Sequence, residues 1–350
     1  MRVVLADPPA YTPPYDHALA AALARQGVDV RLLTSRFRYG AVPAASGYTV
    51  DDSLYRLSTG IGSGHGRLAV KAIEHPLALA RLALARCDLV HLQWVSAPEA
   101  DSWLLHTREP LVFTAHDLLP RRTARHTRSW TRLFQRFDRV VIHSEHGRSA
   151  LAAFGVPATK LRVIPHPAFS SNPAREDDGR TVLALGVIRP YKGLSDAVEA
   201  VLGVPSARLL VAGDPRVPLD ALRAAAGNRA EWRLGYLSEA EITRALGSAT
   251  VAVFPYRAEL DQSGALLRAI GAGVPSVVYD VGGLGEIVGA FGAGRVVPPG
   301  DVEGLKQALR ELLNDAEALA EARAGAERAR TTLTWDKAAA AHLALYEELG

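Results

Sequence analysis

Two cationic residues, Arg189 and Lys192, occupy a turn between an apolar run and a helical pattern. The segment reads GVIRPYKG from Gly186 to Gly193. A helix N-terminus favours anions, a lysine supplies a point charge, and an arginine supplies a bidentate fork. This turn therefore suits a diphosphate. The alternative is an ordinary basic turn on the surface.

A second anion-binding candidate is the segment DQSG, residues 261–264, which precedes the helical pattern ALLRAIGAG. Ser263 and Gly264 are expected at the helix N-terminus, where free amides can receive a phosphate. Asp261 is expected to accept hydrogen bonds from sugar hydroxyls. The alternative is a simple N-cap, because Asp and Ser are preferred there. The following stretch, 273–286, carries paired glycines, which permit close approach of the backbone to a ligand.

In the first half of the chain, histidines occur where apolar runs end. His116 lies just past the run LVFTA, and His91 lies in the run LVHLQW. Carboxyl ends of parallel strands are where ligands of such sheets bind. The alternatives are a helix-capping role for His116 with Asp117 and a buried strand end for His91.

These residues must be positioned by short apolar runs that alternate with helical patterns. The runs are apolar on both faces, which predicts parallel strands covered by helices and two doubly wound α/β domains. A linker-like stretch, 167–179, separates residues 1–167 from residues 168–334, and a helix is expected over 335–350. The expected strands are 2–6, 29–34, 89–94, 111–115, 139–144 and 161–165, then 181–186, 208–213, 231–236, 251–255, 276–280 and 295–298.

Composition excludes several classes of protein. The 350 residues carry 40 Lys and Arg against 37 Asp and Glu, so the formal charge of +3 is too small to indicate a nucleic-acid partner. The single cysteine, Cys87, excludes a disulfide framework and a cysteine-ligated zinc site. No apolar stretch is long enough to span a bilayer, and the first apolar run is too short for a signal peptide. A cytoplasmic location is expected.

The second half resembles the GT4 family of glycosyltransferases. The resemblance is carried by GVIRPYKG, by AGD (212–214), by LGYLSEAEI (234–242), by VFPY, by DQSGALLRAIGAGVPSVVYDVGGLGE and by VVPPGD. It implies the GT-B fold, with two Rossmann-like domains facing each other across a cleft and the last helix crossing back to the first domain. It also implies metal-independent transfer of a sugar, with retention, from a nucleoside-diphosphate sugar to an acceptor hydroxyl. No cofactor is expected.

The resemblance assigns roles to individual residues. Lys192 matches the family's donor-phosphate lysine, whereas the usual phosphate arginine falls at Val187, and Arg189 is the expected substitute. The second of the family's paired glutamates corresponds to Arg268, a departure that affects the ribose contact, and the first corresponds to Asp261 if one residue is deleted. The expected catalytic residues are His116, Asp261 and Glu259; the expected donor-binding residues are Arg189, Lys192, Gly193, Tyr236, Leu237, Gln262, Ser263 and Gly264; the expected acceptor-side residues are Tyr11, Tyr15, Asp16 and His91.

The sequence leaves three points open: the kind of acceptor, the role of the segment 64–86, and the choice between sugar transfer and two other functions. The acceptor is a small molecule, a lipid or a saccharide. The helical pattern over 64–86, with Arg67, Lys71, Arg81 and Arg86, is either a core-packed helix with a solvated basic face, the favoured interpretation, or a peripheral contact with the inner face of a membrane. Two other functions compete with sugar transfer: a GT-B nucleotide-sugar epimerase and a noncatalytic sugar-nucleotide binder.

Overall fold

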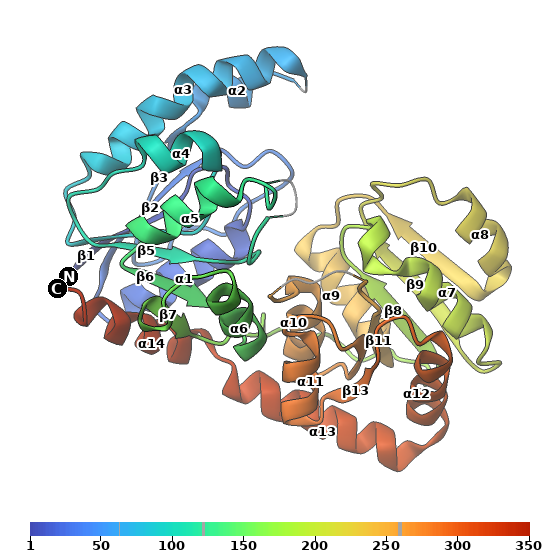
Figure 1. The fold of residues 1–350 in the computed structure, drawn as a ribbon. Helices are drawn as coiled ribbons and strands as arrows, with labels where there is room; N and C mark the ends of the chain where they lie inside the picture. The colour runs from blue at the N-terminus through green and yellow to red at the C-terminus, as the bar shows by residue number, and fades with distance from the viewer. Residues whose placement is uncertain (63, 121–122, 258–260) are drawn as a thin grey trace. The chain divides into compact units, whose positions relative to one another are not determined.

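The computed structural model describes residues 1–62, 64–120, 123–257 and 261–350, which form two compact units. Unit 1 contains Met1–Pro165 and Trp335–Gly350, and unit 2 contains His166–Thr334 (Figure 1). Within the described residues, unit 1 has a seven-stranded sheet and unit 2 a six-stranded sheet, and every strand pair is parallel. The predicted pair of Rossmann-like parallel sheets is confirmed.

The sheet of unit 1 has the strand order β3-β2-β1-β4-β5-β6-β7. Its inner strands are mostly buried, as expected where helices cover both faces, whereas the edge strands β3 and β7 are only partly buried. The elements are β1 (Arg2–Asp7), α1 (Pro13–Arg25), β2 (Asp29–Ser35), β3 (Thr49–Leu54), α2 (Arg56–Gly60), α3 (His65–Ala83), β4 (Leu89–Leu92), α4 (Pro98–Leu104), β5 (Leu111–Thr114), α5 (Thr127–Arg136), β6 (Arg139–Ile142), α6 (Glu145–Ala153), β7 (Leu161–Val163) and α14 (Trp335–Glu347).

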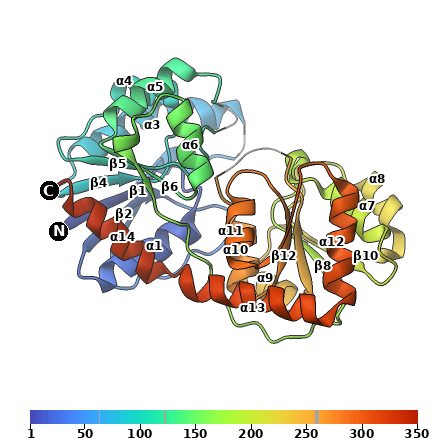
Figure 2. The same ribbon diagram turned by 60° about the horizontal axis from the view of Figure 1, so that its bottom comes forward.

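Helices cover both faces of this sheet. Residues of α3, α5 and α6 share one hydrophobic cluster with the strands, whereas α1 and α14 pack against each other (Figure 2). The last helix of the chain therefore belongs to unit 1. Arg25 of α1 donates to Asp336 of α14, with Nε at 3.1 Å from Oδ1, which fixes the first turn of α14.

Unit 2 has the strand order β10-β9-β8-β11-β12-β13 and a hydrophobic cluster on each face of the sheet. Helices α7 and α12 contribute to one cluster, and α9, α10 and α11 contribute to the other. The elements are β8 (Thr181–Leu185), the 3-10 turn η2 (Pro190–Lys192), α7 (Leu194–Leu202), β9 (Arg208–Gly213), α8 (Asp220–Ala226), β10 (Ala230–Leu234), α9 (Glu239–Ser248), β11 (Val251–Phe254), α10 (Gly264–Gly271), β12 (Ser276–Tyr279), α11 (Leu284–Phe291), β13 (Gly294–Val297), α12 (Val302–Asn314) and α13 (Ala316–Thr332).

One sequence expectation for unit 1 is corrected, and one is compared with the structure in more detail. Strand β3 is absent from the predicted set, because TVDDSL is polar and lies at the edge of the sheet, where one face stays open. The favoured interpretation of 64–86, a core-packed helix with a solvated basic face, agrees with α3, whose Ala78, Leu79 and Leu82 belong to the hydrophobic cluster of unit 1, although the outer side of the helix is apolar as well as basic. Only His75, Ala78, Leu79 and Leu82 of α3 are buried, and Ile73 and Leu77 are among the exposed residues.

Candidate functional site

Each sheet contains one switch point, where the order of strands reverses direction. In unit 2 it lies between β8 and β11, and in unit 1 it lies between β1 and β4. The connections that leave such neighbouring strands run to opposite faces of the sheet, which opens a crevice at their carboxyl ends. Several of the predicted site residues lie at these two places, whereas Tyr236 and Leu237 follow the edge strand β10.

Lys192 occupies the switch point of unit 2, in the turn that follows β8. Its Nζ donates to Tyr256 Oη at 2.8 Å and lies 4.5 Å from the centre of the Tyr256 ring. Tyr256 follows β11, so this hydrogen bond joins the ends of the two strands. Tyr256 Oη lies 3.1 Å from Ser263 Oγ at the start of α10. An ammonium, a phenol and a hydroxyl thus form one connected row, a donor set suited to phosphate oxygens.

Gly193 holds this turn against the end of β11. Its φ is +65°, in the left-handed region that favours glycine. A Cβ at this position would lie 1.9 Å from the carbonyl oxygen of Pro255, so no larger residue fits without moving the turn. Gly193 therefore places Lys192 next to Tyr256.

The predicted DQSG segment contains the N-terminus of α10. Ser263 is the N-cap, and its Oγ accepts a hydrogen bond from the amide of Leu266 at 3.4 Å. Gln262 Nε2 donates to the carbonyl oxygen of Gly283 at 3.1 Å, while its buried Oε1 has no hydrogen-bond partner among the described residues. Asp261 is fully buried, and Glu259 lies outside the described residues.

Arg257 is a charged group of this region that sequence reasoning missed. Its Nε donates to Asp196 Oδ2 at 3.1 Å, and Tyr279 Oη donates to the same oxygen at 3.1 Å. The hydrogen bond and charge of Asp196 raise the pKa of Arg257. The sequence signal that could have identified Arg257 is its position directly after the segment VFPY. Arg189, the predicted phosphate arginine, is exposed and has no ion-pair partner among the residues that the structure describes.

The predicted nucleobase region follows β10. Tyr236 is exposed, and Leu237 packs against the cluster that contains α9 and α10. Arg268, which stands where the family has a glutamate, forms a bidentate pair with Glu239, with nitrogen–oxygen distances of 2.6 and 2.8 Å. Its guanidinium lies 4.9 Å from the centre of the Phe169 ring. The ion pair with Glu239 and the contact with the Phe169 ring therefore hold the Arg268 guanidinium in place.

The switch point of unit 1 is organised around Thr12. Its amide donates to Asp7 Oδ2 at 3.0 Å, and its Oγ1 accepts from Trp94 Nε1 at 2.8 Å. These contacts join the loop after β1 to the segment after β4. Ala10 has a φ of +54°, a conformation that costs energy for a residue with a side chain, so the surrounding contacts must hold it.

Two buried carboxyl groups, Asp7 and Asp16, lie beneath this loop. Thr12 Oγ1 lies 3.4 Å from both carboxylate oxygens of Asp16. Burial raises the pKa of Asp7, and burial together with the charge of Asp7 raises the pKa of Asp16 well above its ordinary value. Two such groups resist losing both protons, so the structure favours a pair that retains one.

His116 lies in an aromatic cluster at the same edge of the sheet. Its Nε2 is 3.0 Å from Gln93 Oε1, and its ring stacks on Trp94 with a centroid distance of 5.4 Å. Tyr15 meets the His116 ring edge-on at 4.6 Å, and Tyr11 meets the Trp94 ring edge-on at 5.3 Å. Tyr11 is exposed, whereas Tyr15 is buried. The cluster thus presents Tyr11 to solvent and holds His116 from several sides.

The structure does not make His91 available to an acceptor. The residue is fully buried, with Nδ1 at 2.7 Å from Tyr346 Oη and Nε2 at 2.7 Å from Thr114 Oγ1. Both ring nitrogens are used, so His91 connects α14 to β5 rather than facing a ligand. Asp16, also predicted on the acceptor side, is buried and acts through Thr12.

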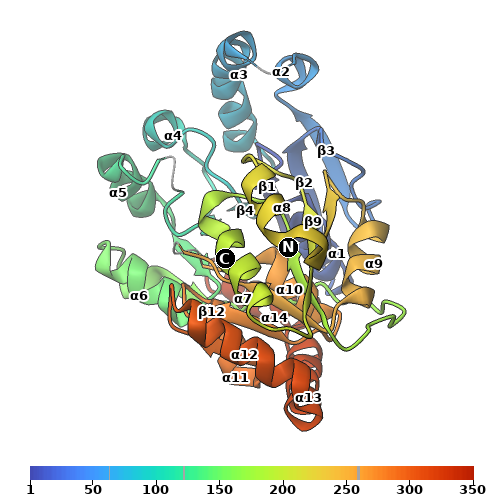
Figure 3. The same cartoon turned by 90° about the vertical axis from the view of Figure 1, so that its right-hand side faces the viewer.

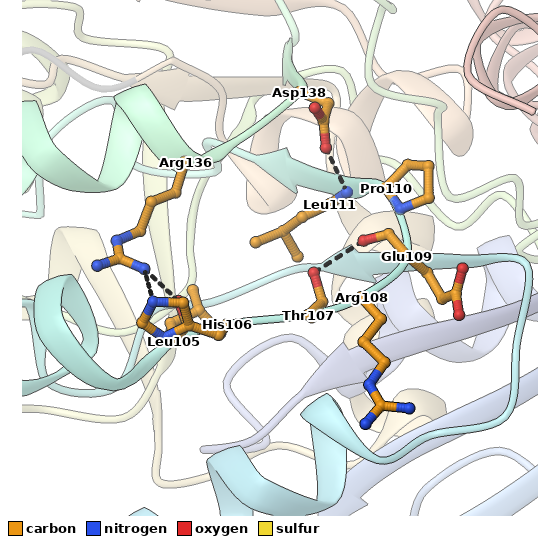
Figure 4. A pocket seen from close by; sticks show the side chains of 9 residues that line it. All are labelled: Leu105, His106, Thr107, Arg108, Glu109, Pro110, Leu111, Arg136 and Asp138. Carbon is orange, nitrogen blue, oxygen red and sulfur yellow. Dashed lines mark hydrogen bonds between the residues drawn. The ribbon is translucent and has the colours of Figure 1, made fainter.

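A hollow of about 370 Å³ lies elsewhere in unit 1, beside the amino ends of β5 and β6 (Figure 4). Arg136 Nη1 is bound there to the carbonyl oxygen of Leu105 at 2.9 Å and to His106 Nε2 at 2.8 Å. Asp138 Oδ2 accepts from the amide of Leu111 at 2.8 Å. Because ligands of doubly wound sheets bind at the carboxyl ends of the strands, this hollow is not the candidate site.

The described residues contain no group of three or more His, Cys, Asp or Glu side chains that could hold a metal ion. Within the same residues, every helix is too short or too polar to cross a bilayer.

The chain matches two protein-family models. Residues 15–168 match Glycosyltransferase Family 4, and residues 179–315 match Glycosyl transferases group 1. A glycogen synthase from Mycobacterium tuberculosis is 33% identical over 47% of this chain, and this match covers 42% of the synthase, less than half its length. A phosphatidyl-myo-inositol mannosyltransferase from Mycobacterium leprae is 29% identical. This match covers 74% of this chain and 73% of the mannosyltransferase.

Solved structures are similar in fold. Sucrose-phosphate synthase from Thermosynechococcus elongatus aligns with a TM-score of 0.80 and 20% identity, covering 100% of this chain and 99% of that chain. HepE from Anabaena, in complex with UDP and glucose, aligns with a TM-score of 0.69 and 16% identity, covering 100% of both chains. Identities this low show a shared architecture alone.

Proposed function

Because the chain belongs to the GT4-type glycosyltransferases of the GT-B fold, we propose that it transfers a sugar from a nucleoside-diphosphate sugar to an acceptor hydroxyl. The proposal includes retention of anomeric configuration and independence of metal ions. The epimerase and noncatalytic alternatives are not favoured, since the matched families are described as transferases.

The observation that carries the proposal is the row formed by Lys192, Tyr256 and Ser263 at the switch point of unit 2. Lys192 has three N–H donors, and the structure records a hydrogen bond from Nζ only to Tyr256 within the described residues. The remaining donors are free to meet phosphate oxygens. The amides at the start of α10 add positive potential beside them. We propose that this row binds the donor diphosphate.

Charge stabilisation is the main chemical contribution that these residues can make. Negative charge accumulates on the diphosphate as it leaves, and groups held in place stabilise that charge without reorganising. Lys192 and the α10 amides supply this stabilisation, and the exposed Arg189 adds a bidentate fork. The acceptor hydroxyl attacks from the face that the diphosphate leaves: its oxygen bonds to the anomeric carbon as the bond between that carbon and the diphosphate breaks, and its proton passes to the leaving diphosphate.

The proposal also assigns residues to the sugar and to the nucleoside of the donor. Asp261 and Glu259 accept hydrogen bonds from the sugar hydroxyls, which for the buried Asp261 requires a local rearrangement. Tyr236 and Leu237 meet the nucleobase. His116 of unit 1 orients the transferred sugar.

Unit 1 supplies the acceptor side in this proposal. The exposed ring of Tyr11, backed by Trp94, offers an apolar surface that suits a cyclic acceptor. HepE was solved with UDP and glucose, and a related protein is named a phosphatidyl-myo-inositol mannosyltransferase. These names support a nucleotide-sugar donor and a sugar-type acceptor.

Calorimetric titration with UDP, GDP, ADP and dTDP tests the donor assignment. We expect one of them to bind the wild-type protein and to bind Lys192→Met at least about 10-fold more weakly, because a charge-assisted hydrogen bond is lost. Methionine keeps the unbranched side chain that packs over Tyr256. The matched control, Lys306→Met, removes a lysine of α12 that pairs with Glu303. Equal affinity of Lys192→Met and wild type would refute the assignment.

A further inference from the structure

Gln93 lies directly past β4, at the switch point of unit 1. Its backbone amide donates to the carbonyl oxygen of Ala6 at 2.7 Å, which continues the pairing of β4 with β1. These two strands are neighbours in the sheet (Figures 2 and 3). The side chain of Gln93 is fully buried. The sheet itself, rather than a surface loop, therefore sets the position of this side chain.

The carboxamide of Gln93 contacts His116, which follows the next strand, β5. Gln93 Oε1 lies 3.0 Å from His116 Nε2. A carboxamide oxygen only accepts hydrogen bonds, so the shared proton belongs to His116 Nε2. A neutral imidazole carries one N–H, and its other ring nitrogen is an acceptor. The contact therefore places the proton on Nε2 and makes Nδ1 the acceptor.

The strand on the other side of β4 favours this orientation of the amide. Ala6 pairs with Leu92, so the next residues, Asp7 and Gln93, follow on adjacent strands with side chains on the same face of the sheet. Among the residues that the structure describes, Gln93 Nε2 and Asp7 Oδ1 are buried without a hydrogen-bond partner. Because β4 lies between β1 and β5, the part of the amide that does not contact His116 is nearer to Asp7. An NH2 group is favourable beside a carboxyl oxygen, whereas a carbonyl oxygen there is repelled.

The plane of the His116 ring is held by other contacts. The ring stacks on Trp94 with an angle of 18° between the two planes, and Tyr15 meets it edge-on at 4.6 Å. Trp94 is in turn held by the hydrogen bond from its Nε1 to Thr12 Oγ1 at 2.8 Å. These ring contacts restrict rotation of the imidazole but do not distinguish its two nitrogens. The hydrogen bond to Gln93 does distinguish them.

An amide and a carboxylate at this position have different consequences for His116. A carboxylate within hydrogen-bond distance favours the charged imidazolium, which has a proton on both nitrogens. The amide of Gln93 accepts the same hydrogen bond without adding charge. Gln93 therefore suits a histidine that accepts a hydrogen bond from its ligand and does not donate one.

We propose that Gln93 is a positioning residue that fixes His116 as the tautomer with the proton on Nε2, so that Nδ1 accepts a hydrogen bond from a substrate hydroxyl. This inference rests on the proposed function, in which His116 orients the transferred sugar. It adds the direction of the contact, since the sugar hydroxyl donates and the imidazole accepts. The opposite tautomer would present an N–H to the sugar and would reverse the hydrogen bond.

Proton–nitrogen NMR of the full chain, labelled with nitrogen-15 in histidine, tests the tautomer without any donor or acceptor. The two neutral tautomers and the imidazolium differ in their nitrogen shifts, and the signals missing from His116→Asn identify those of His116. We expect the wild type at pH 7 to carry a proton on His116 Nε2 and none on Nδ1. A proton on Nδ1, in the neutral or in the charged ring, would overturn the proposal.

Gln93→Met tests whether Gln93 sets the tautomer, because methionine keeps the length of the side chain and removes the carboxamide. We expect the His116 signals of this variant to move toward a mixture of the two tautomers. The matched control, Gln135→Met, replaces an exposed glutamine of α5 and should leave the His116 signals as in the wild type. Melting temperatures verify that both variants are folded. Unchanged His116 signals in folded Gln93→Met would refute the proposal.

Steady-state rates connect the tautomer to the reaction. Gln93→Met should lower kcat at least about 10-fold, because a misoriented group loses much of its effect on the rate. The affinity for nucleoside diphosphate should change little, since the proposed nucleotide contacts lie in unit 2. Wild-type kcat in a variant with an altered tautomer would refute the positioning role. If the wild type transferred no sugar from any donor, the proposed function would fail, and the NMR measurement would still decide the role of Gln93.

Discussion

Single residues organise the candidate site where their hydrogen bonds join the ends of neighbouring strands. Lys192 was predictable because its turn has a local pattern of glycines and cations. Its partner Tyr256 and the pair Arg257 and Asp196 were not assigned, because these contacts join residues that lie far apart in the sequence. The same holds for Thr12 and Trp94 in unit 1. Local patterns predict which turns carry charge, whereas hydrogen bonds between distant segments depend on the packed fold.

Asp16 gives a prediction about pH. The pKa of Asp7 and that of Asp16 are both raised in the folded state, so the folded protein holds a proton that the unfolded chain has lost. Stability from this pair is full at acidic pH and falls as pH rises through the folded pKa values. Each unit of raised pKa corresponds to about 1.4 kcal/mol. We expect Asp16→Asn, which cannot ionise, to lose less stability than wild type as pH rises from 4 to 8.

Melting temperatures across this pH range, compared between wild type and Asp16→Asn, measure the effect. The comparison removes the contribution of titrating groups other than the coupled pair Asp7 and Asp16. Asp52→Asn, at an exposed position of β3, is the control and should follow wild type. If the curves of wild type and Asp16→Asn were parallel, the pair would not share a proton.

His116 gives a prediction about turnover. Its ring is held by Gln93, Trp94 and Tyr15, which suits a group that orients a substrate. We expect His116→Ala to lower the transfer rate by roughly 100-fold, the range for a positioned catalytic group. Nucleotide affinity should change little, because the proposed nucleotide contacts lie in unit 2. Initial rates and calorimetry measure the two quantities, and lost binding with preserved turnover would contradict the assignment.

Among the secondary-structure elements, the apolar periodicity of the sequence predicted the strands that are buried on both faces. It did not predict the strand at the edge of the unit 1 sheet. The apolar runs of both halves coincide with central strands, because such strands must be covered by helices. The edge strand β3 has no such pattern. In α3 the apolar periodicity indicated a helix packed on the core, and Ala78, Leu79 and Leu82 do belong to the hydrophobic cluster of unit 1, but it did not indicate that Ile73 and Leu77 are exposed.

Helix α14 contains a buried neutral histidine, His342. His342 Nδ1 lies 2.7 Å from the carbonyl oxygen of Ala338, and burial lowers the pKa of His342 to about 4. The same cause lowers the pKa of His143 to about 4. The unfolded chain binds these protons more readily, so stability is present above pH 6.5 and is lost as pH falls toward 4.

We therefore expect His342→Gln, which does not titrate, to lose less stability on acidification than wild type. The difference should reach about 2 kcal/mol at pH 5. Urea unfolding at pH 7 and pH 5 measures it. His65→Gln, at an exposed position of α3, is the control. An equal loss in wild type and His342→Gln would show that His342 is not held neutral.

In the molecule as a whole, each of the two units has a switch point, and the two switch points carry different chemical groups. Unit 2 offers cations and helix amides, and unit 1 offers aromatic rings and a histidine. We expect chelation by EDTA to leave the transfer rate unchanged, because Lys192 and Arg189 take the role that a divalent ion has on a diphosphate. Rates with and without EDTA measure this. Loss of activity that magnesium or manganese restores would contradict it.

The proposed function requires that Lys192, Tyr256 and Ser263 activate a sugar donor for transfer. The most direct measurement follows UDP-, GDP-, ADP- and dTDP-linked sugars by proton NMR, with monosaccharide, cyclitol and lipid acceptors. We predict release of a nucleoside diphosphate and a product with the anomeric configuration of the donor, at a rate at least about 100-fold lower in Lys192→Met. Conversion of the donor sugar without an acceptor, or binding of a donor that no acceptor consumes, would contradict the account.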